Sequence, residues 1–173
     1  MANTTFSGPV RSEDGFDVVS KNSTTGAITT EFSLDGSGLQ VTPVTFGDED
    51  TTLTATANAG RVNVVPAITG NRTLTLPSPS AGVWFRLIYG GAAEEAENLI
   101  IDTGSDTNFF IGGIVHIQSD ADSASVYSDG NSNSKLTLTD FGIFEINILA
   151  KDSTNWIIWG YQEGADAPAF ADQ

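Results

Sequence analysis

Five aspartates lie where the sequence predicts loops, and carboxylates from neighbouring loops of a β protein can bind Ca²⁺ or act on a glycosidic bond. They are Asp102, Asp106, Asp120, Asp122 and Asp129. Their spacing does not follow the twelve-residue calcium loop, and in a chain with 22 acidic residues some carboxylates cluster by chance. We therefore expect no catalytic, cofactor-binding or metal-binding residues. Ca²⁺ at these loops and a glycan hydrolase that uses two of the carboxylates stay as alternatives.

The other residue types on which catalysis depends are scarce. His116 is the only histidine, and it lies in the alternating segment Ile114–Ile117, where a partly exposed strand residue is the simpler interpretation. The absence of cysteine excludes disulfides, thiolate catalysis and cysteine-bound metals. Neither a Gly-x-Ser-x-Gly motif nor a Walker-type phosphate loop occurs in the sequence. The sequence therefore predicts a protein that is not an enzyme.

Three tryptophans, Trp84, Trp156 and Trp159, could form a platform for sugar rings, because aromatic faces bind the apolar faces of pyranoses. All three lie in the most hydrophobic predicted strands, where packing in a core is the ordinary role. Trp156 and Trp159 point to opposite faces of their strand, since side chains alternate along it. One of the two must then be covered by a second layer, an arm or another subunit. We assign all three tryptophans to oligomer contacts or second-layer packing.

Alternation of apolar and polar residues dominates the chain after Gly47, and short alternating segments with turn residues between them are typical of a β-sandwich or barrel. The predicted strands are Thr51–Ala57, Thr73–Pro77, Gly82–Tyr89, Asn98–Ile101, Ile114–Ile117, Ala124–Tyr127, Lys135–Thr139, Gly142–Leu149 and Asn155–Tyr161. The last two should form a hairpin. Gly91–Glu97 is rich in helix formers but too short to persist as a helix alone. We predict an all-β fold, an antiparallel, jelly-roll-like β-sandwich over residues 46–163, with a C-terminal tail over residues 164–173.

Residues 1–45 contain few, widely spaced apolar side chains and cannot build a core of their own. Turn signals recur in this segment at Ser7–Pro9, Glu13–Gly15, Thr25–Gly26 and Asp35–Gly38. We interpret the segment as an extended N-terminal arm with short strands that docks on a partner. Its content of Ser, Thr and Asn also fits a flexible tail.

The charge of the chain restricts its partners. It has 7 basic and 22 acidic residues, a formal net charge of −15, so its surface should repel nucleic acid and anionic lipid. An acidic surface also keeps a protein soluble. The N-terminus shows neither the basic nor the apolar region of a secretory signal peptide, and no apolar run is long enough for a membrane span. We expect a protein made in the cytoplasm, with no nucleic-acid or membrane partner.

Several segments carry a resemblance to a known class of proteins. Met1–Phe16 resembles the start of small virion proteins of tailed bacteriophages, particularly those of marine hosts. Thr73–Pro77, Ala81–Phe85, Gly112–Gly113 and Asp152–Gly160 are similar to β-sandwich modules of phage structural proteins. The resemblance implies a capsid decoration, or cement, protein on the capsid surface of the virion, typically a homotrimer, that stabilises the shell and is no enzyme. The implied partners are the major capsid protein and further copies of the chain.

On this interpretation the arm makes the contact with the capsid, because an extended segment can add strands to the edge of a neighbouring sheet. The candidate interface residues lie at the start of the arm: Phe6, Pro9, Val10, Arg11 and Phe16. Arg11 could pair with an acidic capsid surface or stay exposed without a partner. A second hypothesis, based on the aromatic and Asp-rich loops, is a receptor- or glycan-binding component of a head or tail fibre.

Overall fold

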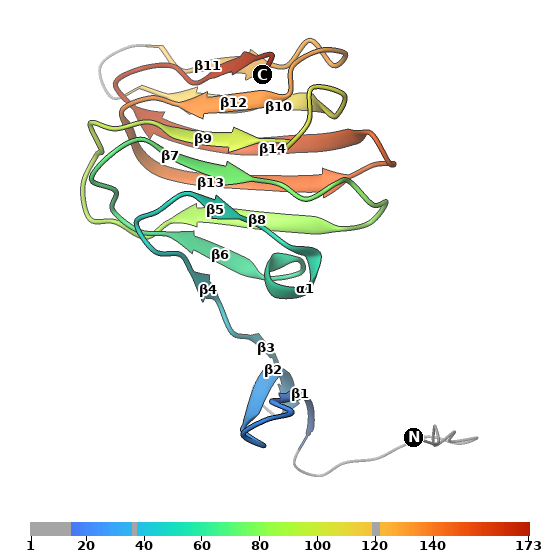
Figure 1. Ribbon diagram of the computed structural model, residues 1–173. Helices are drawn as coiled ribbons and strands as arrows, with labels where there is room; N and C mark the ends of the chain where they lie inside the picture. The colour runs from blue at the N-terminus through green and yellow to red at the C-terminus, as the bar shows by residue number, and fades with distance from the viewer. Residues whose placement is uncertain (1–14, 36–37, 119–121) are drawn as a thin grey trace. The chain divides into compact units, whose positions relative to one another are not determined.

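Two units make up the chain in the computed structural model, which describes residues 15–35, 38–118 and 122–173. They divide between Thr42 and Pro43. The first unit contains β1 to β3, and the second contains all later elements (Figure 1). In the described residues, helix is limited to α1 (Ala55–Asn58), so the predicted all-β fold is confirmed.

The first unit is a three-stranded antiparallel sheet in the order β1-β2-β3. Its strands are β1 (Phe16–Lys21), β2 (Ile28–Asp35) and β3 (Gly38–Val41). The side-chain oxygen of Asn22 shapes the first turn, because it accepts hydrogen bonds of 2.9 Å from the backbone N–H groups of Thr24 and Thr25. Every residue of β1 is exposed. The described side chains of this strand therefore add no core to the unit, and small sheets without a packed face are marginally stable.

The second unit is a β-sandwich of two sheets (Figure 1). The seven-stranded sheet contains, in spatial order, β11 (Ala124–Tyr127), β10 (Phe109–Ile117), β14 (Asn155–Gly164), β13 (Phe141–Ala150), β8 (Trp84–Tyr89), β6 (Val62–Val65) and β4 (Val44–Thr45). The five-stranded sheet contains β15 (Ala169–Ala171), β12 (Lys135–Leu138), β9 (Leu99–Asp102), β7 (Arg72–Thr75) and β5 (Thr51–Thr52).

From β4 to β9 the chain crosses from one sheet to the other after every strand, so neighbours within a sheet are two strands apart in the sequence. The pairs β4–β6, β6–β8, β5–β7 and β7–β9 are consequently parallel. Later pairs are mostly antiparallel, and β13 and β14 form the predicted hairpin. However, β14 also pairs in parallel with β10. The sandwich is therefore mixed, whereas the sequence suggested antiparallel pairing throughout.

The core fills the space between the two sheets with alternate residues of each strand. Its fully buried side chains include Phe85, Leu87, Leu99, Ile101, Phe110, Leu136, Phe144, Ile146, Ile148 and Trp156. The ring centroids of Phe85 and Trp156 are 5.8 Å apart, within the range of favourable aromatic contacts. The alternation that predicted the strands thus corresponds to one buried face per sheet.

Residues 51–57, predicted as one strand, form the short strand β5 and the helix α1. Thr54 begins the helix, and its hydroxyl accepts a hydrogen bond of 3.1 Å from the backbone N–H of Ala57. Buried Asn58 donates to the side chain of Asn63 at 3.0 Å, and Asn63 donates back to the backbone oxygen of Asn58 at 3.0 Å. This amide pair fixes the helix against β6. The segment Gly91–Glu97, in contrast, forms no helix.

Residues 164–173, expected to be a tail, complete the five-stranded sheet. Their strand β15 pairs antiparallel with β12. Phe170 packs against the core, with its ring centroid 6.1 Å from that of Phe110. Backbone pairing with β12 and the packing of Phe170 thus hold the C-terminal segment in the sheet, which its composition of small residues did not indicate.

The core assignment predicts different costs for two isoleucines of β13. Ile148 is fully buried, whereas Ile143 is 57% exposed. Ile148→Ala should lower the free energy of unfolding by about 2–5 kcal/mol, because it removes buried methyl groups and leaves a cavity. Ile143→Ala should change it by no more than about 0.5 kcal/mol. Urea unfolding followed by circular dichroism measures both, and equal losses would contradict the assignment of the two faces.

Candidate interaction surface

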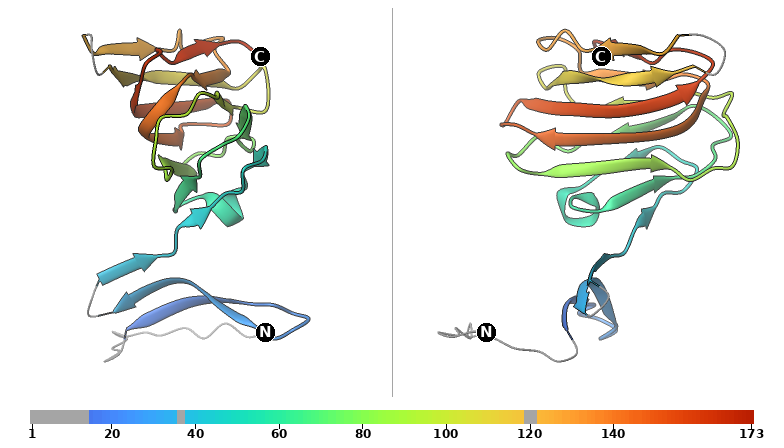
Figure 2. Two further views of the ribbon diagram at one scale, coloured as in Figure 1. Left: turned by 90° about the vertical axis from the view of Figure 1, so that its left-hand side faces the viewer. Right: turned by 180° about the vertical axis from the view of Figure 1, so that it is seen from behind.

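One face of the seven-stranded sheet points away from the five-stranded sheet, and Figure 2 (right) shows β8, β13 and β14 uncovered by other elements of the second unit. We call it the outer face. It consists of the side chains that alternate with core residues on four central strands: Trp84, Arg86, Ile88, Ile111, Val115, Ile117, Glu145, Asn147, Leu149, Ile157, Trp159 and Tyr161. Most of them are apolar, although they are partly or fully exposed.

The register of the strands arranges the outer face in rows across the sheet. The first row is Trp84, Leu149, Ile157 and Ile111. The second row is Arg86, Asn147, Trp159 and Gly113. The third row is Ile88, Glu145, Tyr161 and Val115. Side chains that are neighbours in a row have Cβ atoms about 4.5–5.5 Å apart, so the first row forms a continuous apolar strip, whereas Arg86, Asn147 and Glu145 interrupt the second and third rows.

Arg86 and Glu145 are the charged side chains of the outer face, and they pair with each other. The guanidinium of Arg86 donates to the Glu145 carboxylate at 3.1 Å, and the Asn147 amide donates to the other carboxylate oxygen at 3.3 Å. The hydrogen bond from Arg86, followed by that from Asn147, lowers the pKa of Glu145. Glu163 lies at the margin, beside Ile117. The middle of the face is therefore electrically neutral in a chain of net charge −15.

A shallow depression of about 650 Å³ lies on the outer face between β10, β13 and β14, and Val115, Trp159 and Tyr161 are among its lining residues. Gly113 contributes to the floor. A Cβ atom at Gly113 would lie 2.2 Å from the backbone oxygen of Val126, so only glycine lets β11 approach this closely. The depression is open enough for a protruding side chain of another molecule.

The structure separates the three tryptophans singled out from the sequence. Trp156 is fully buried between the sheets, and its indole Nε1 has no hydrogen-bond partner there. Trp84 and Trp159 lie on the outer face, 42% and 47% exposed. Trp156 therefore belongs to packing between the two layers, while the other two are available for contacts with another molecule.

Of the candidate interface residues of the arm, the structure describes Phe16. Phe16, the first residue of β1, is 47% exposed. Phe6, Pro9, Val10 and Arg11 lie outside the described residues. Further apolar side chains of the first unit are exposed as well, although the sequence analysis did not single them out: Val18, Val19, Ile28 and Leu34. The sequence could have identified some of them, because Val18 and Val19 are consecutive, and consecutive side chains of a regular strand point to opposite faces. Apolar side chains on both faces of a strand indicate that each face packs against other residues.

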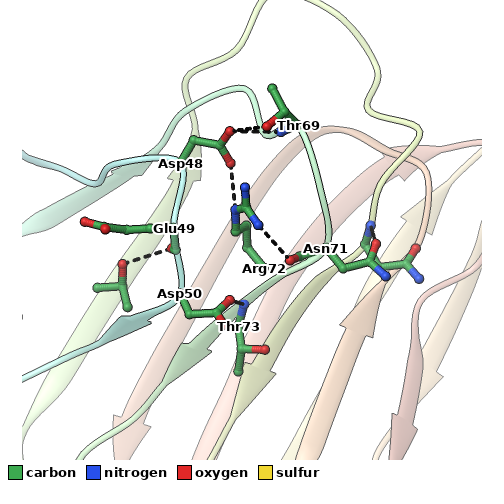
Figure 3. Close-up of polar contacts among 9 residues, drawn as sticks. Asp48, Glu49, Asp50, Thr69, Asn71, Arg72 and Thr73 are labelled. Carbon is green, nitrogen blue, oxygen red and sulfur yellow. Dashed lines mark hydrogen bonds and ion pairs between the residues drawn. The ribbon is translucent and has the colours of Figure 1, made fainter.

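A polar network ties the first residues of the sandwich to the loop before β7 (Figure 3). The Asp48 carboxylate accepts hydrogen bonds from the Thr69 hydroxyl at 2.6 Å, the Thr69 backbone N–H at 3.1 Å and the Arg72 Nε–H at 2.7 Å. Asp50 accepts a bond of 2.9 Å from the backbone N–H of Thr73. These contacts fix the chain shortly after it enters the second unit.

A second pocket, of about 560 Å³, lies beside Tyr89, Glu94 and Glu163. The Tyr89 hydroxyl donates to the backbone oxygen of Ala93 at 2.7 Å and also contacts the Glu95 carboxylate. Burial, and next the hydrogen bond with Glu95, raise the pKa of Tyr89 to about 12. Glu94 accepts a hydrogen bond from a loop N–H. At neutral pH the Tyr89 phenol is protonated, so it braces the loop at Ala93 and does not act as a base.

Asp129 and His116 have structural roles in the second unit. Asp129 accepts hydrogen bonds from three backbone N–H groups and from the Ser132 hydroxyl, which lower its pKa. His116, expected to be partly exposed, is buried, with Nε2 2.9 Å from the backbone oxygen of Gly164. Asp120 lies outside the described residues. Among residues 15–35, 38–118 and 122–173, no three acidic, histidine or cysteine side chains are grouped to hold a metal ion.

Comparison with known proteins leaves the chain without a family: no protein-family model matches it, and no curated protein is significantly similar to it. Within the described part of the chain, no helix is both long and apolar enough to cross a membrane. Two surfaces of the described structure thus remain as candidates for function. They are the exposed apolar strands of the first unit and the outer face of the second.

Removing the Asp48 carboxylate should change how the stability of the fold depends on pH. The hydrogen bond from Arg72, followed by that from Thr69, lowers the pKa of Asp48 below its ordinary value of 3.8. The carboxylate therefore stabilises the fold above that value, and its contribution disappears as the pH falls through the lower pKa of the folded state. Asp48→Asn should lower stability at pH 7 and flatten its decline below about pH 4.

Thermal unfolding between pH 2 and pH 7 measures the effect. Asp106→Asn is the matched control, because Asp106 is an exposed loop aspartate of the same unit. The control should follow the wild-type curve. If both variants show the same acid dependence, the Asp48 network does not contribute to stability.

Proposed function

We propose that the chain is a non-enzymatic structural protein of a bacteriophage virion, a capsid decoration protein that stabilises the shell. The observation that carries the proposal is the division into a sandwich with a complete core and a small sheet whose first strand is exposed along its whole length. A sheet of this kind gains stability by packing on another molecule. The resemblance of Met1–Phe16 and of the sandwich segments to phage structural proteins supports the virion assignment.

The first unit is suited to attachment by strand addition. Its outer strands, β1 and β3, each have one edge without a partner among the described strands. Unpaired backbone groups at a sheet edge can bind an extended segment of another protein, and neighbouring apolar side chains add affinity. The major capsid protein is the partner that we propose for this unit.

The second unit supplies the rigid body of the proposed decoration. A load on residues before Pro43 reaches the sandwich through β4 and the segment that follows, where Asp48 and Asp50 bind Thr69, Arg72 and Thr73. Side-chain and backbone contacts share this load, so it does not depend on one short strand. The net charge of −15 favours a position on the outer capsid surface, away from packaged nucleic acid. We propose a homotrimer as the assembled form.

A specific observation favours a second candidate function, a receptor- or glycan-binding fibre component. Trp159 and Tyr161 lie beside the open depression of the outer face. Exposed aromatic rings next to hydrogen-bonding groups such as Asn147 and Glu145 can bind sugars. A glycan array with the full chain tests this candidate. Binding that disappears in Trp159→Ala would favour the fibre, and no binding to any glycan would count against it.

Attachment through the first unit is tested with particles that lack the protein. Ile28→Asp places a charge on an exposed apolar residue of β2 and should weaken binding of the chain to the particles by at least about tenfold, as expected for an interface anchor. Ile143→Asp, the same substitution at an exposed residue of the sandwich, should bind like the wild type. Co-sedimentation with particles of the encoding virus measures both.

Unimpaired binding of Ile28→Asp would contradict attachment through this unit. The number of copies per particle separates the two functions, because decoration of a symmetric lattice requires on the order of hundreds of copies and a fibre on the order of a dozen. Quantitative mass spectrometry of purified particles gives this number. A count of about a dozen would overturn the decoration proposal.

A further inference from the structure

We infer that the outer face of the seven-stranded sheet is the surface through which the chain binds a second copy of itself. This inference assigns a partner to a specific face and does not depend on attachment to a capsid. Trp84, Val115, Ile117 and Trp159 are each at least 40% exposed there. Large apolar side chains gathered on one exposed sheet face are typical of protein interfaces.

The size of the outer face fits a stable interface. Four strands at about 4.8 Å spacing, with some seven residues at about 3.3 Å each, give a patch of roughly 400 Å² in projection. The protruding indole and isoleucine side chains increase its accessible area beyond this value. A standard interface buries about 800 Å² from each partner, so the outer face can form the central part of such an interface.

Charge identifies a second copy as the occupant. Two chains of net charge −15 repel each other, so they can associate only where the contact brings few carboxylates together. The outer face meets this condition, because Glu145 is neutralised by Arg86 at 3.1 Å. Apart from Glu163 at the margin, acidic groups such as Asp48 and Glu94 lie in loops outside this face. A neutral apolar face also gives no electrostatic preference for a basic partner, whereas it matches its own copy in polarity.

The polar cluster of Arg86, Glu145 and Asn147 lies in the middle of the patch. It would determine how the two copies align with each other. Glu145 accepts hydrogen bonds from Arg86 and Asn147, so its carboxylate remains paired when the face is covered, although the buried Nε–H of Arg86 has no partner among the described residues. Apolar rows alone could slide along each other. A polar cluster among them favours arrangements in which it meets a polar or open position on the surface of the second copy.

The full chain and two single variants test the inference. Sedimentation equilibrium should show the wild type as a homo-oligomer. Trp159→Glu, which places a carboxylate at the centre of the outer face, should weaken self-association at least about 30-fold, as for a central interface residue. Ile28→Glu changes an exposed apolar residue of the first unit and should leave the oligomer intact.

Three results would overturn the inference: a wild type that is monomeric at all concentrations, a Trp159→Glu variant with unchanged mass, or dissociation caused by Ile28→Glu and not by Trp159→Glu. The last result would assign the contact to the first unit. Circular dichroism checks the fold of each variant. If Trp159→Glu does not fold, Val115→Asp on the neighbouring strand takes its place, with the same expected loss.

Acrylamide quenching gives a readout independent of mass. Trp156 is buried in either state, whereas Trp84 and Trp159 are accessible only when the outer face is free. Dilution of the wild type through the dissociation range should therefore increase quenching and shift the emission to longer wavelength. Added salt should reverse both changes, because it screens the repulsion between acidic copies. Quenching that does not change as the mass falls would place the contact elsewhere.

Discussion

The two strands at the centre of the seven-stranded sheet carry large apolar side chains on both faces, and a two-layer sandwich buries only one of them. On the inner side Ile148 and Trp156 pack against the five-stranded sheet. On the outer side Leu149, Ile157 and Trp159 face away from it. Because hydrophobic burial is the main source of stability, the inner side determines the fold. The outer side determines which contacts the folded molecule can still make.

The sequence predicts this two-sidedness well, because it depends only on the spacing of residues along one strand. Trp156 and Trp159 could be placed on opposite faces before any partner strand was known. The neighbours of each strand could not be predicted in the same way, because alternation specifies a face and leaves the pairing open. The crossing of the chain between sheets from β4 to β9, with its parallel pairs, therefore has no signal in the sequence.

Features of the candidate surfaces that depend on distant residues were also beyond prediction. The Asp48 network joins residues more than 20 positions apart, and Arg86 meets Glu145 across two strands far apart in the chain. The burial of His116 follows from its place on the inner side of β10, which the sequence could not distinguish from the outer side. Local signals predicted turns and strands, whereas contacts between them arise only from the topology.

The place of β14 in the sheet has a consequence for biosynthesis. This strand, Asn155–Gly164, lies between β10 and β13, although it follows both of them in the sequence. Until the ribosome has released it, β10 and β13 each lack a neighbour, and most of the core around Trp156 cannot form. The first unit emerges long before that moment. The sandwich therefore folds only after its central strands have all been synthesised, and until then nascent chains on one polysome expose their unpaired strands to each other and to chaperones.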